Sequence, residues 1–342
     1  MDPTALRPLG RTGVRVTQLG FGGAAIGELY TKVSEADAIG ALDAAWEAGI
    51  RYFDTSPWYG RGLSELRTGA ALRKRPREEF VISTKVGRWL HAAADPSRFT
   101  YEPWAGGLPF EIVFDYSYDG IMRAYEQSQL RLGMARYDFA IVHDLDVRHH
   151  GRGTRLDWHL GQLAGSGWRA LDALKRAGEI RGIGAGINER GMITRLLDTF
   201  EIDFFLVAMP YTLLHQDALE DEFPACEERG IGFVIGAVYQ SGILASGPVP
   251  GAKYNYLPAP PEIIERVSRI QAVCERHSVP LAAAALQFPL GHPSAASVIP
   301  GASTAKHVQR NVATFRHPIP DALWQELKAE GLLRPDAPTP QA

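Results

Sequence analysis

The sequence predicts an α/β protein, specifically a (β/α)8 TIM barrel in which eight parallel strands alternate with helices. Short apolar runs rich in β-branched and aromatic residues alternate with longer helical patterns, and 342 residues suit this fold. The apolar runs are continuous rather than alternating, as in parallel strands covered by helices. We expect a single barrel domain over 1–332 and a Pro-rich, disordered tail over 333–342.

Eight apolar runs are the predicted strands. In chain order they are VTQLGFGG (16–23), IRYFD (50–54), FVISTK (80–85), DFAIVH (138–143), IRGIGAG (180–186), DFFLVAM (203–209), GFVIGAV (232–238) and ASVIP (296–300).

Helical patterns fill the segments between these runs. Ser34 is the predicted N-cap of the first helix, and Gly49 is its C-terminal stop. The later patterns are SELRTGAALRK, DGIMRAYEQSQLRLG, GWRALDALKRAG, ERGMITRLLDTF, DALEDEFPACEERG, PPEIIERVSRIQAVCERH and STAKHVQRNVATF, with a further helix expected at 321–331.

Two connections, 86–118 and 144–165, are much longer than a tight link between a strand and a helix. Long loops in a compact domain usually serve function or are disordered. The first loop is expected to wall a pocket with the residues Trp89, His91, Trp104 and Pro109.

Composition excludes several classes of partner. The net charge is −3 and the basic residues are scattered, which argues against nucleic acid or an anionic membrane. No stretch reaches the roughly 20 apolar residues of a membrane span, and the N-terminus lacks a signal-peptide core. Cys226 and Cys274 do not make a disulfide framework, so we expect a cytoplasmic protein.

Ionisable residues stand at three successive strand ends. Asp54, Lys85 and His143 end the second, third and fourth strands, and Tyr59 follows the second. Active groups of such barrels come from the carboxyl ends of strands. We therefore expect these four side chains to meet at one mouth of the barrel.

Each of the four also has a purely structural interpretation. Asp54 could cap a turn, Lys85 could be a solvated strand end, His143 could be a satisfied rim residue, and Tyr59 could be a packed loop aromatic. Their joint order on three successive strand ends favours the functional interpretation.

The motifs DTSPWYG and ISTKVG, together with the strand end at His143, resemble the catalytic tetrad of the aldo-keto reductases, which are NAD(P)-dependent barrel oxidoreductases. The resemblance runs from LGRTGVRVTQLGFGG to IPGASTAKHVQRN. It implies that RPLGRTGVRVT forms a hairpin across the barrel bottom. The stretches GGAAIG, SPWYGRGLSE and GIGAGIN are most similar to the D-threo-aldose 1-dehydrogenase branch, which includes sugar and pyridoxal dehydrogenases.

The resemblance implies a role for each member of the tetrad. Tyr59 is the general acid/base, Lys85 lowers the pKa of the phenol, Asp54 holds Lys85, and His143 orients the substrate oxygen. A nearby ammonium favours phenolate, since a free phenol has a pKa of about 10. Positioned proton transfer contributes typically about 10²–10⁴-fold to a rate.

The resemblance also implies a set of cofactor-binding residues. These are Gly22, Gly23, Ala24, Asn188, Tyr211, Ser241, Gly242, Leu244, Gly301, Ser303 and Asn311. Tyr211 would stack on the nicotinamide, although a Tyr near a strand end is as often a core residue.

The sequence departs from the family pattern at the residues that bind the carboxamide group of the nicotinamide. Gly186 stands in place of a hydroxyl residue, and Ala208 in place of a Gln. Only Lys306 and Arg310 are available near the adenosine 2′ position, and a 2′-phosphate requires a fixed positive partner. We therefore expect NAD as the cofactor, with NADP as the alternative.

Three other interpretations remain. GFGGAA (20–25) matches a Rossmann fingerprint, but the next helix begins too late. HDLDVRHH could hold a metal through His143, Asp144, Asp146, His149 and His150, yet these residues come from one strand end, and we predict no metal. A nucleotide-sensing subunit without enzymatic activity would have no need of the tetrad.

The predicted function is oxidation of an aldose at C1 to the lactone. A pyridoxine-type aldehyde or alcohol, or a general aldehyde, is the alternative substrate. Trp58 and Trp89 are the expected pocket wall, with loop packing as the alternative role for both. The sequence leaves open whether the protein is a monomer or a homo-oligomer.

Overall fold

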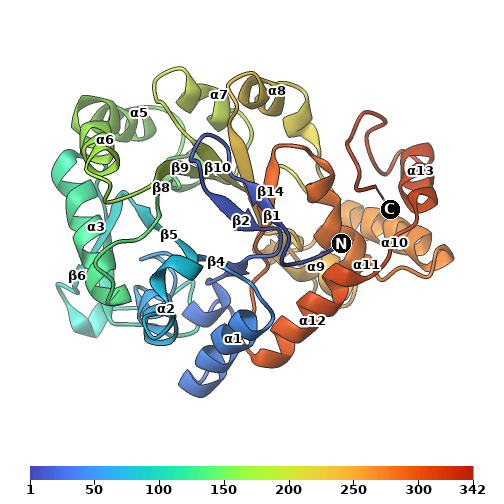
Figure 1. The fold of residues 1–342 in the computed structure, drawn as a ribbon, viewed down its shortest axis with the longest axis horizontal. Coiled ribbons are helices and arrows are strands. Elements are labelled where there is room, and N and C mark those ends of the chain that lie inside the picture. The colour runs from blue at the N-terminus through green and yellow to red at the C-terminus, as the bar shows by residue number, and fades with distance from the viewer. Residues whose placement is uncertain (342) are drawn as a thin grey trace.

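The computed structural model describes residues 1–341, and its centre is a sheet of eight parallel strands curled into a barrel (Figure 1). Isolated parallel bridges, Leu19 to Val298 and Gly22 to Gly301, join the first strand to the last. The predicted barrel is confirmed, and each predicted run holds all or most of one barrel strand, although the first run also includes the end of the hairpin strand β2 (Arg15–Thr17). The strands are β3 (Phe21–Gly22), β4 (Tyr52–Asp54), β5 (Val81–Val86), β8 (Phe139–His143), β9 (Gly182–Ile187), β10 (Phe204–Ala208), β11 (Gly232–Gly236) and β14 (Ala295–Val298).

The register of the strands brings their carboxyl ends to one mouth. Asp54 on β4 pairs with Ser83 on β5, and His143 on β8 pairs with Gly186 on β9. Lys85 pairs with Ile141, two residues before the end of β8. Residues that are distant in sequence therefore meet at a single edge, because all eight strands run in the same direction.

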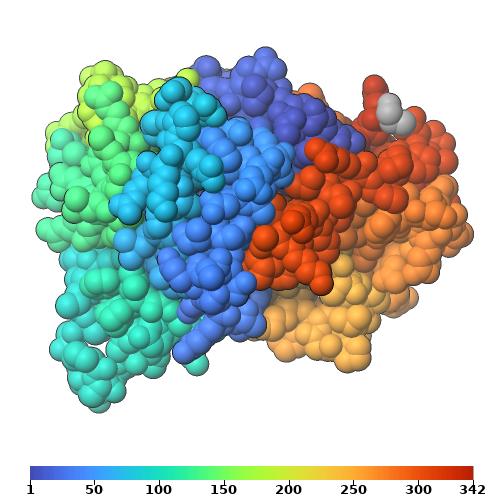
Figure 2. Space-filling model, turned by 60° about the horizontal axis from the view of Figure 1, so that its bottom comes forward, coloured from blue at the N-terminus to red at the C-terminus, as the bar shows by residue number. Residues whose placement is uncertain are grey.

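Helices surround the barrel, and the first and last helices of the ring pack side by side (Figures 1 and 2). The ring consists of α1 (Glu35–Glu47), α2 (Leu63–Leu72), α3 (Tyr118–Leu132), α6 (Trp168–Arg176), α7 (Met192–Leu197), α8 (Glu222–Glu227), α11 (Leu281–Gln287) and α12 (Ala305–Arg316), with α10 (Pro261–Arg276) and α13 (Asp321–Ala329) added outside.

The helix α11 was not predicted. Its sequence LAAAALQ is almost wholly buried and has no polar face, so no helical period marks it. The amphipathic α10, which the sequence did predict, packs on α11 and α13 from outside. Complete burial removed the signal that marks a surface helix.

The N-terminal hairpin, β1 (Leu6–Pro8) paired with β2 (Arg15–Thr17), closes the barrel at the amino ends of the strands. Gly10 at its turn has a φ of +48°, and an added Cβ would lie 2.2 Å from the Asp203 carbonyl oxygen. Only glycine fits so close to the start of β10. The hairpin implied by the resemblance is therefore present.

The two long connections contain regular elements that the sequence analysis treated as loops. Residues 86–118 hold an antiparallel hairpin, β6 (Arg88–Ala92) with β7 (Phe110–Phe114), and this teal segment projects at the lower left of Figure 2. Residues 144–165 hold α4 (Val147–His150) and α5 (Thr154–Gln162). A further hairpin, β12 (Lys253–Tyr254) with β13 (Leu257–Pro258), follows the short α9 (Ile243–Ser246) after β11.

Two apolar layers stabilise this arrangement. The inner layer fills the barrel with side chains such as Tyr52, Phe139 and Phe204. The outer, larger layer lies between strands and helices. Burial of apolar area at roughly 25 cal/mol per Å² makes these layers the main stabilising contribution.

The C-terminal tail differs from the expected disorder. Leu333 and Ala337 are buried, and Arg334 pairs with Glu220 and Asp336. Composition predicted disorder because the segment is rich in Pro, but its few apolar side chains reach the barrel surface. Within residues 1–341 no helix has the length and apolar character needed to cross a membrane.

Candidate active site

A cavity of about 710 Å³ lies at the carboxyl ends of the barrel strands. This volume is within the range typical of small-molecule sites, roughly 300–1,000 Å³. All eight strand ends reach its lining, through Gly22, Asp54, Lys85, His143, Ile187, Ala208, Gly236 and Ile299.

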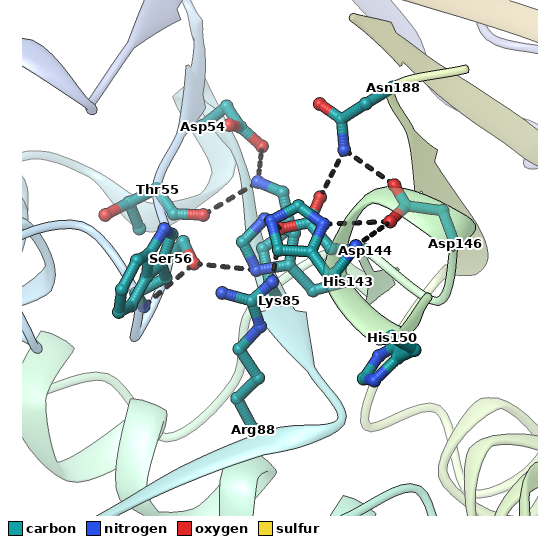
Figure 3. A network of polar contacts seen from close by, with 12 residues as sticks. Asp54, Thr55, Ser56, Lys85, Arg88, His143, Asp144, Asp146, His150 and Asn188 are labelled. Atoms are coloured by element: carbon teal, nitrogen blue, oxygen red, sulfur yellow. Dashed lines mark hydrogen bonds and ion pairs between the residues drawn. The ribbon is translucent and has the colours of Figure 1, made fainter. Parts of the chain in front are cut away.

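The floor of the cavity holds a buried ion pair. Lys85 Nζ donates to Asp54 Oδ1 at 2.5 Å and to the Thr55 carbonyl oxygen at 2.8 Å (Figure 3). The Ser83 hydroxyl donates to the same Asp54 oxygen at 2.6 Å. Burial raises the pKa of Asp54 above its ordinary value, and the Lys85 ammonium opposes that rise. The pair is thus fixed by hydrogen bonds from both neighbouring strands.

Tyr59 lies on the loop after β4 and lines the cavity above Lys85. Lys85 Nζ is 5.4 Å from the centroid of the Tyr59 ring. The centroids of the Tyr59 and His143 rings are 6.1 Å apart. Burial, followed by the negative charges of Asp54 and Asp144, raises the pKa of Tyr59 well above 10. This direction is opposite to the expected lowering by Lys85, because burial has the largest effect on the pKa of the phenol.

His143 ends β8 and is almost fully buried. Its Nδ1 lies 3.2 Å from the Ser56 hydroxyl, and its carbonyl oxygen accepts a hydrogen bond from the Tyr116 hydroxyl. Burial lowers the pKa of His143 well below 6.5, against the effect of the neighbouring Asp144. The imidazole is therefore neutral near pH 7 and has a single N–H group to donate.

Beside His143 stands a polar network that sequence reasoning did not find. Arg88, which is 1% exposed, pairs with Asp144 Oδ2. The Asn188 amide donates to Asp144 Oδ1 at 2.7 Å and to Asp146 Oδ2 at 2.9 Å. His149 Nδ1 lies 2.8 Å from Asp146 Oδ1. Figure 3 labels the other members of this network, Arg88, Asp144, Asp146 and Asn188. Arg88 and Asp144 are 56 residues apart, so no local pattern joins them.

This network argues against the metal interpretation of HDLDVRHH. Asp144, Asp146 and His149 do converge. However, the carboxylates of Asp144 and Asp146 already interact with Arg88, Asn188 and His149. His150 contacts the Tyr116 hydroxyl and does not face these carboxylates. A divalent cation would have to displace a buried guanidinium. The Rossmann interpretation of GFGGAA fails as well, because Gly22 ends a barrel strand and α1 begins only at Glu35.

Open space lies beside two glycines of the cavity lining. An added Cβ at Gly186 would meet no atom nearer than 3.6 Å, and one at Gly242 would meet none within 4 Å. The predicted cofactor residues that line this cavity are Gly22, Gly23, Ala24, Asn188, Ser241, Gly242 and Gly301. The residues present therefore fit a nicotinamide cofactor.

The other predicted site residues lie outside the cavity. Tyr211 is fully buried against Phe223 and Phe288, which corresponds to the alternative role of a core residue. Leu244 is also a core residue, and Trp89 packs against Arg123.

Two further residues lie near α12. Ser303 contacts His307, at 3.0 Å between the hydroxyl and Nδ1. Asn311 receives a hydrogen bond of 3.4 Å from the Tyr239 hydroxyl and borders a small adjoining cleft. Both are therefore beside the main cavity rather than in it.

The structure adds aromatic and cationic side chains to the cavity wall. Trp104 stands edge-on to Trp58, with 5.6 Å between ring centroids. Tyr256 of the β12–β13 turn lies under the Arg148 guanidinium, and Lys253 lies over Tyr30. The first long loop had indicated Trp104 as a pocket residue, but no sequence signal marked the β12–β13 turn.

Comparison with known proteins assigns the chain to a family. The sequence model of the Aldo/keto reductase family matches residues 18–330, and the chain belongs to that family. It is therefore an NAD(P)-dependent oxidoreductase that acts on small aldehydes or alcohols.

Particular relatives are similar over nearly the whole chain. Pyridoxal 4-dehydrogenase of Microbacterium luteolum is 43% identical over 96% of this chain and 97% of its own. D-threo-aldose 1-dehydrogenase of a Pseudomonas species is 39% identical over the same shares. The holo form of an aldo-keto reductase from Bacillus halodurans has a TM-score of 0.72 at 26% identity, covering 97% of both chains.

Proposed function

We propose that the protein oxidises an aldose at C1 to the lactone, with NAD as the hydride acceptor and Tyr59 as the general acid/base. A bound nicotinamide would supply the acceptor for the C1 hydride. In the oxidation, the deprotonated form of Tyr59 accepts the hydroxyl proton of the substrate. The O–H and C1–H bonds are broken as the carbonyl forms, and the hydride from C1 goes to the acceptor. His143 donates a hydrogen bond to the same oxygen and orients it.

The observation that carries this proposal is the juxtaposition of Lys85, Asp54, Tyr59 and His143 at the floor of one cavity. The fixed ammonium of Lys85 near the Tyr59 ring stabilises negative charge that develops on the phenol during proton transfer. Asp54 keeps that ammonium in place.

The wall of the cavity supports a polyhydroxylated substrate. The aromatic faces of Trp58 and Trp104 offer apolar area to the C–H face of a sugar ring. Asp144, His149 and Asn188 offer hydrogen-bonding groups in the same cavity.

Pyridoxal is a second candidate substrate. It is favoured by the 43% identity to a pyridoxal 4-dehydrogenase, compared with 39% for the aldose enzyme. A pyridine ring also suits an aromatic wall.

The choice of NAD rests on the shortage of fixed cations near the predicted adenosine end. Lys306 and Arg310 are both exposed on α12, and neither is positioned as a fixed partner for a phosphate. We also place the reaction in a reducing cytoplasm, because both cysteines are free thiols.

A substrate panel tests the proposal. Aldoses and pyridoxal are each assayed with NAD and with NADP at the absorbance of the reduced cofactor, alongside the Tyr59→Phe variant. We expect turnover of an aldose with NAD and a fall in kcat of about 10²–10⁴-fold in the variant. Turnover of pyridoxal alone would select the second candidate, and full activity of the variant would remove Tyr59 from the mechanism.

A further inference from the structure

Asp144 follows the last residue of β8, yet its side chain faces the same cavity as that of His143. Consecutive residues of a regular strand point to opposite faces. Asp144 departs from this rule because its φ is +49°, in the left-handed region that Asp tolerates better than most residues. This backbone conformation therefore directs the side chains of His143 and Asp144 into the same cavity.

The Asp144 carboxylate is fixed and ionised. The Arg88 guanidinium donates to Oδ2 and the Asn188 amide donates to Oδ1. Burial raises the pKa of Asp144, but His143, Arg88 and His149 oppose that rise and hold the pKa below its ordinary value. His149 Nε2 also lies 3.4 Å from Oδ2. A carboxylate has about four acceptor positions, so these neighbours still leave an acceptor position for a substrate.

His143 presents a hydrogen-bond donor next to this acceptor. The Ser56 hydroxyl accepts from the Trp58 backbone N–H at 3.0 Å, which leaves its own proton to donate to His143 Nδ1 at 3.2 Å. The neutral imidazole then carries its proton on Nε2. Nε2 lies 3.3 Å from Asp144 Oδ2, too weakly aligned to count as a hydrogen bond, so both atoms remain available to a substrate.

We propose that Asp144 is a specificity-determining residue whose carboxylate accepts a hydrogen bond from a hydroxyl next to the reacting carbon, while His143 Nε2–H binds the reacting oxygen. The required substrate has two oxygens on neighbouring carbons. One of these is the reacting oxygen and the other carries a proton.

This substrate class deepens the proposed function and rests on it. An aldose carries a hydroxyl on C2 beside C1, whereas in pyridoxal the ring hydroxyl is one carbon further from the aldehyde carbon. Of the two candidates, only the aldose has the required pair of groups. The geometry selects α-hydroxy carbonyl compounds and their hemiacetals over simple aldehydes and alcohols.

Two matched substrate pairs test the role of Asp144. Galactose is compared with 2-deoxygalactose in oxidation, and glycolaldehyde with acetaldehyde in reduction. We expect kcat/KM to favour the hydroxylated member of each pair by at least about 10²-fold, because without the hydroxyl one acceptor position of the buried Asp144 carboxylate has no donor. In Asp144→Asn this ratio should fall below about tenfold, most of the loss coming from the hydroxylated member. Calorimetric titration of the galactose pair gives the same comparison without turnover.

The matched control is Asp146→Asn, because Asp146 shares the Asn188 partner but does not line the cavity. It should keep the ratio of the native enzyme. If Asp144→Asn fails to fold, Arg88→Gln with Asp144→Asn removes the unpaired guanidinium and allows the same measurement.

Several results would overturn the role of Asp144. These are an unchanged ratio in Asp144→Asn, an equal loss in Asp146→Asn, and no preference or no binding of the hydroxylated members in the native enzyme. A preference for glycolaldehyde without any activity on galactose would instead reject the proposed aldose reaction and support Asp144.

Discussion

Two buried ion pairs border the cavity, and they differ in how the chain builds them. The floor pair, Lys85 with Asp54, joins the ends of adjacent barrel strands. The wall pair, Arg88 with Asp144, joins a projecting hairpin to a left-handed turn. The carboxyl of the floor pair has a raised pKa and that of the wall pair a lowered one. The barrel strands thus position the floor pair, and the connections between strands and helices position the wall pair.

Replacing the cation of the floor pair should have the largest effect on activity. We expect Lys85→Met to lower kcat by about 10²–10⁴-fold, because no ammonium then stabilises charge on Tyr59. The fold should survive, because loss of the Lys85 ammonium raises the pKa of Asp54 further and favours the neutral carboxyl. NAD binding, followed by calorimetry, should remain close to native. Near-normal turnover would exclude Lys85 from the mechanism.

The same floor predicts a steep pH dependence. The pKa of Tyr59 is raised well above 10, so the phenol is protonated across the neutral range. In oxidation Tyr59 must accept a proton, and only its deprotonated form can do so. We therefore expect kcat/KM for oxidation to rise about tenfold per pH unit between about pH 6 and 9, whereas reduction should stay nearly flat.

The control for this pH profile is Tyr59→Phe, which should lose the slope along with the activity. A bell-shaped oxidation profile centred near pH 7 in the native enzyme would contradict the raised pKa and return the tuning role to Lys85.

The wall pair should be more important to stability than the floor pair. Arg88→Met leaves Asp144 charged without its buried partner, which costs about 3–5 kcal/mol of unfolding free energy. Urea unfolding measures this loss, and Lys85→Met should lose less. The double variant Arg88→Met with Asp144→Leu should recover much of the stability. A loss below about 1 kcal/mol would show that water in the cavity replaces the guanidinium.

The floor was predictable from the sequence and the wall was not, for a physical reason. Asp54, Lys85 and His143 each end an apolar run, and parallel strands bring such ends together whatever the loops do. Arg88 and Asp144 meet only because a hairpin folds back and one residue adopts a positive φ. Neither event leaves a periodic signal in the sequence.

The residue roles implied by the family resemblance show the same difference between positions set by strand ends and positions set by loop conformation. Gly22, Ser241 and Gly301 line the cavity because strand ends and a backbone turn place them there. Tyr211 instead packs into the core with Phe223, since side-chain direction beyond a strand end depends on the following loop.

Two tryptophans of one hairpin segment give the smallest and most discriminating prediction. Trp104 lines the cavity beside Trp58, whereas Trp89, which the sequence favoured, packs outside it under Arg123. Trp104→Leu should raise KM for the substrate by about tenfold, the cost of roughly 1.4 kcal/mol of lost aromatic contact. Trp89→Leu removes the same side chain from the same segment and should leave KM within about twofold of native. Equal effects in both variants would mean that the hairpin acts as a unit, and that the loop residues do not make separate contributions to the wall.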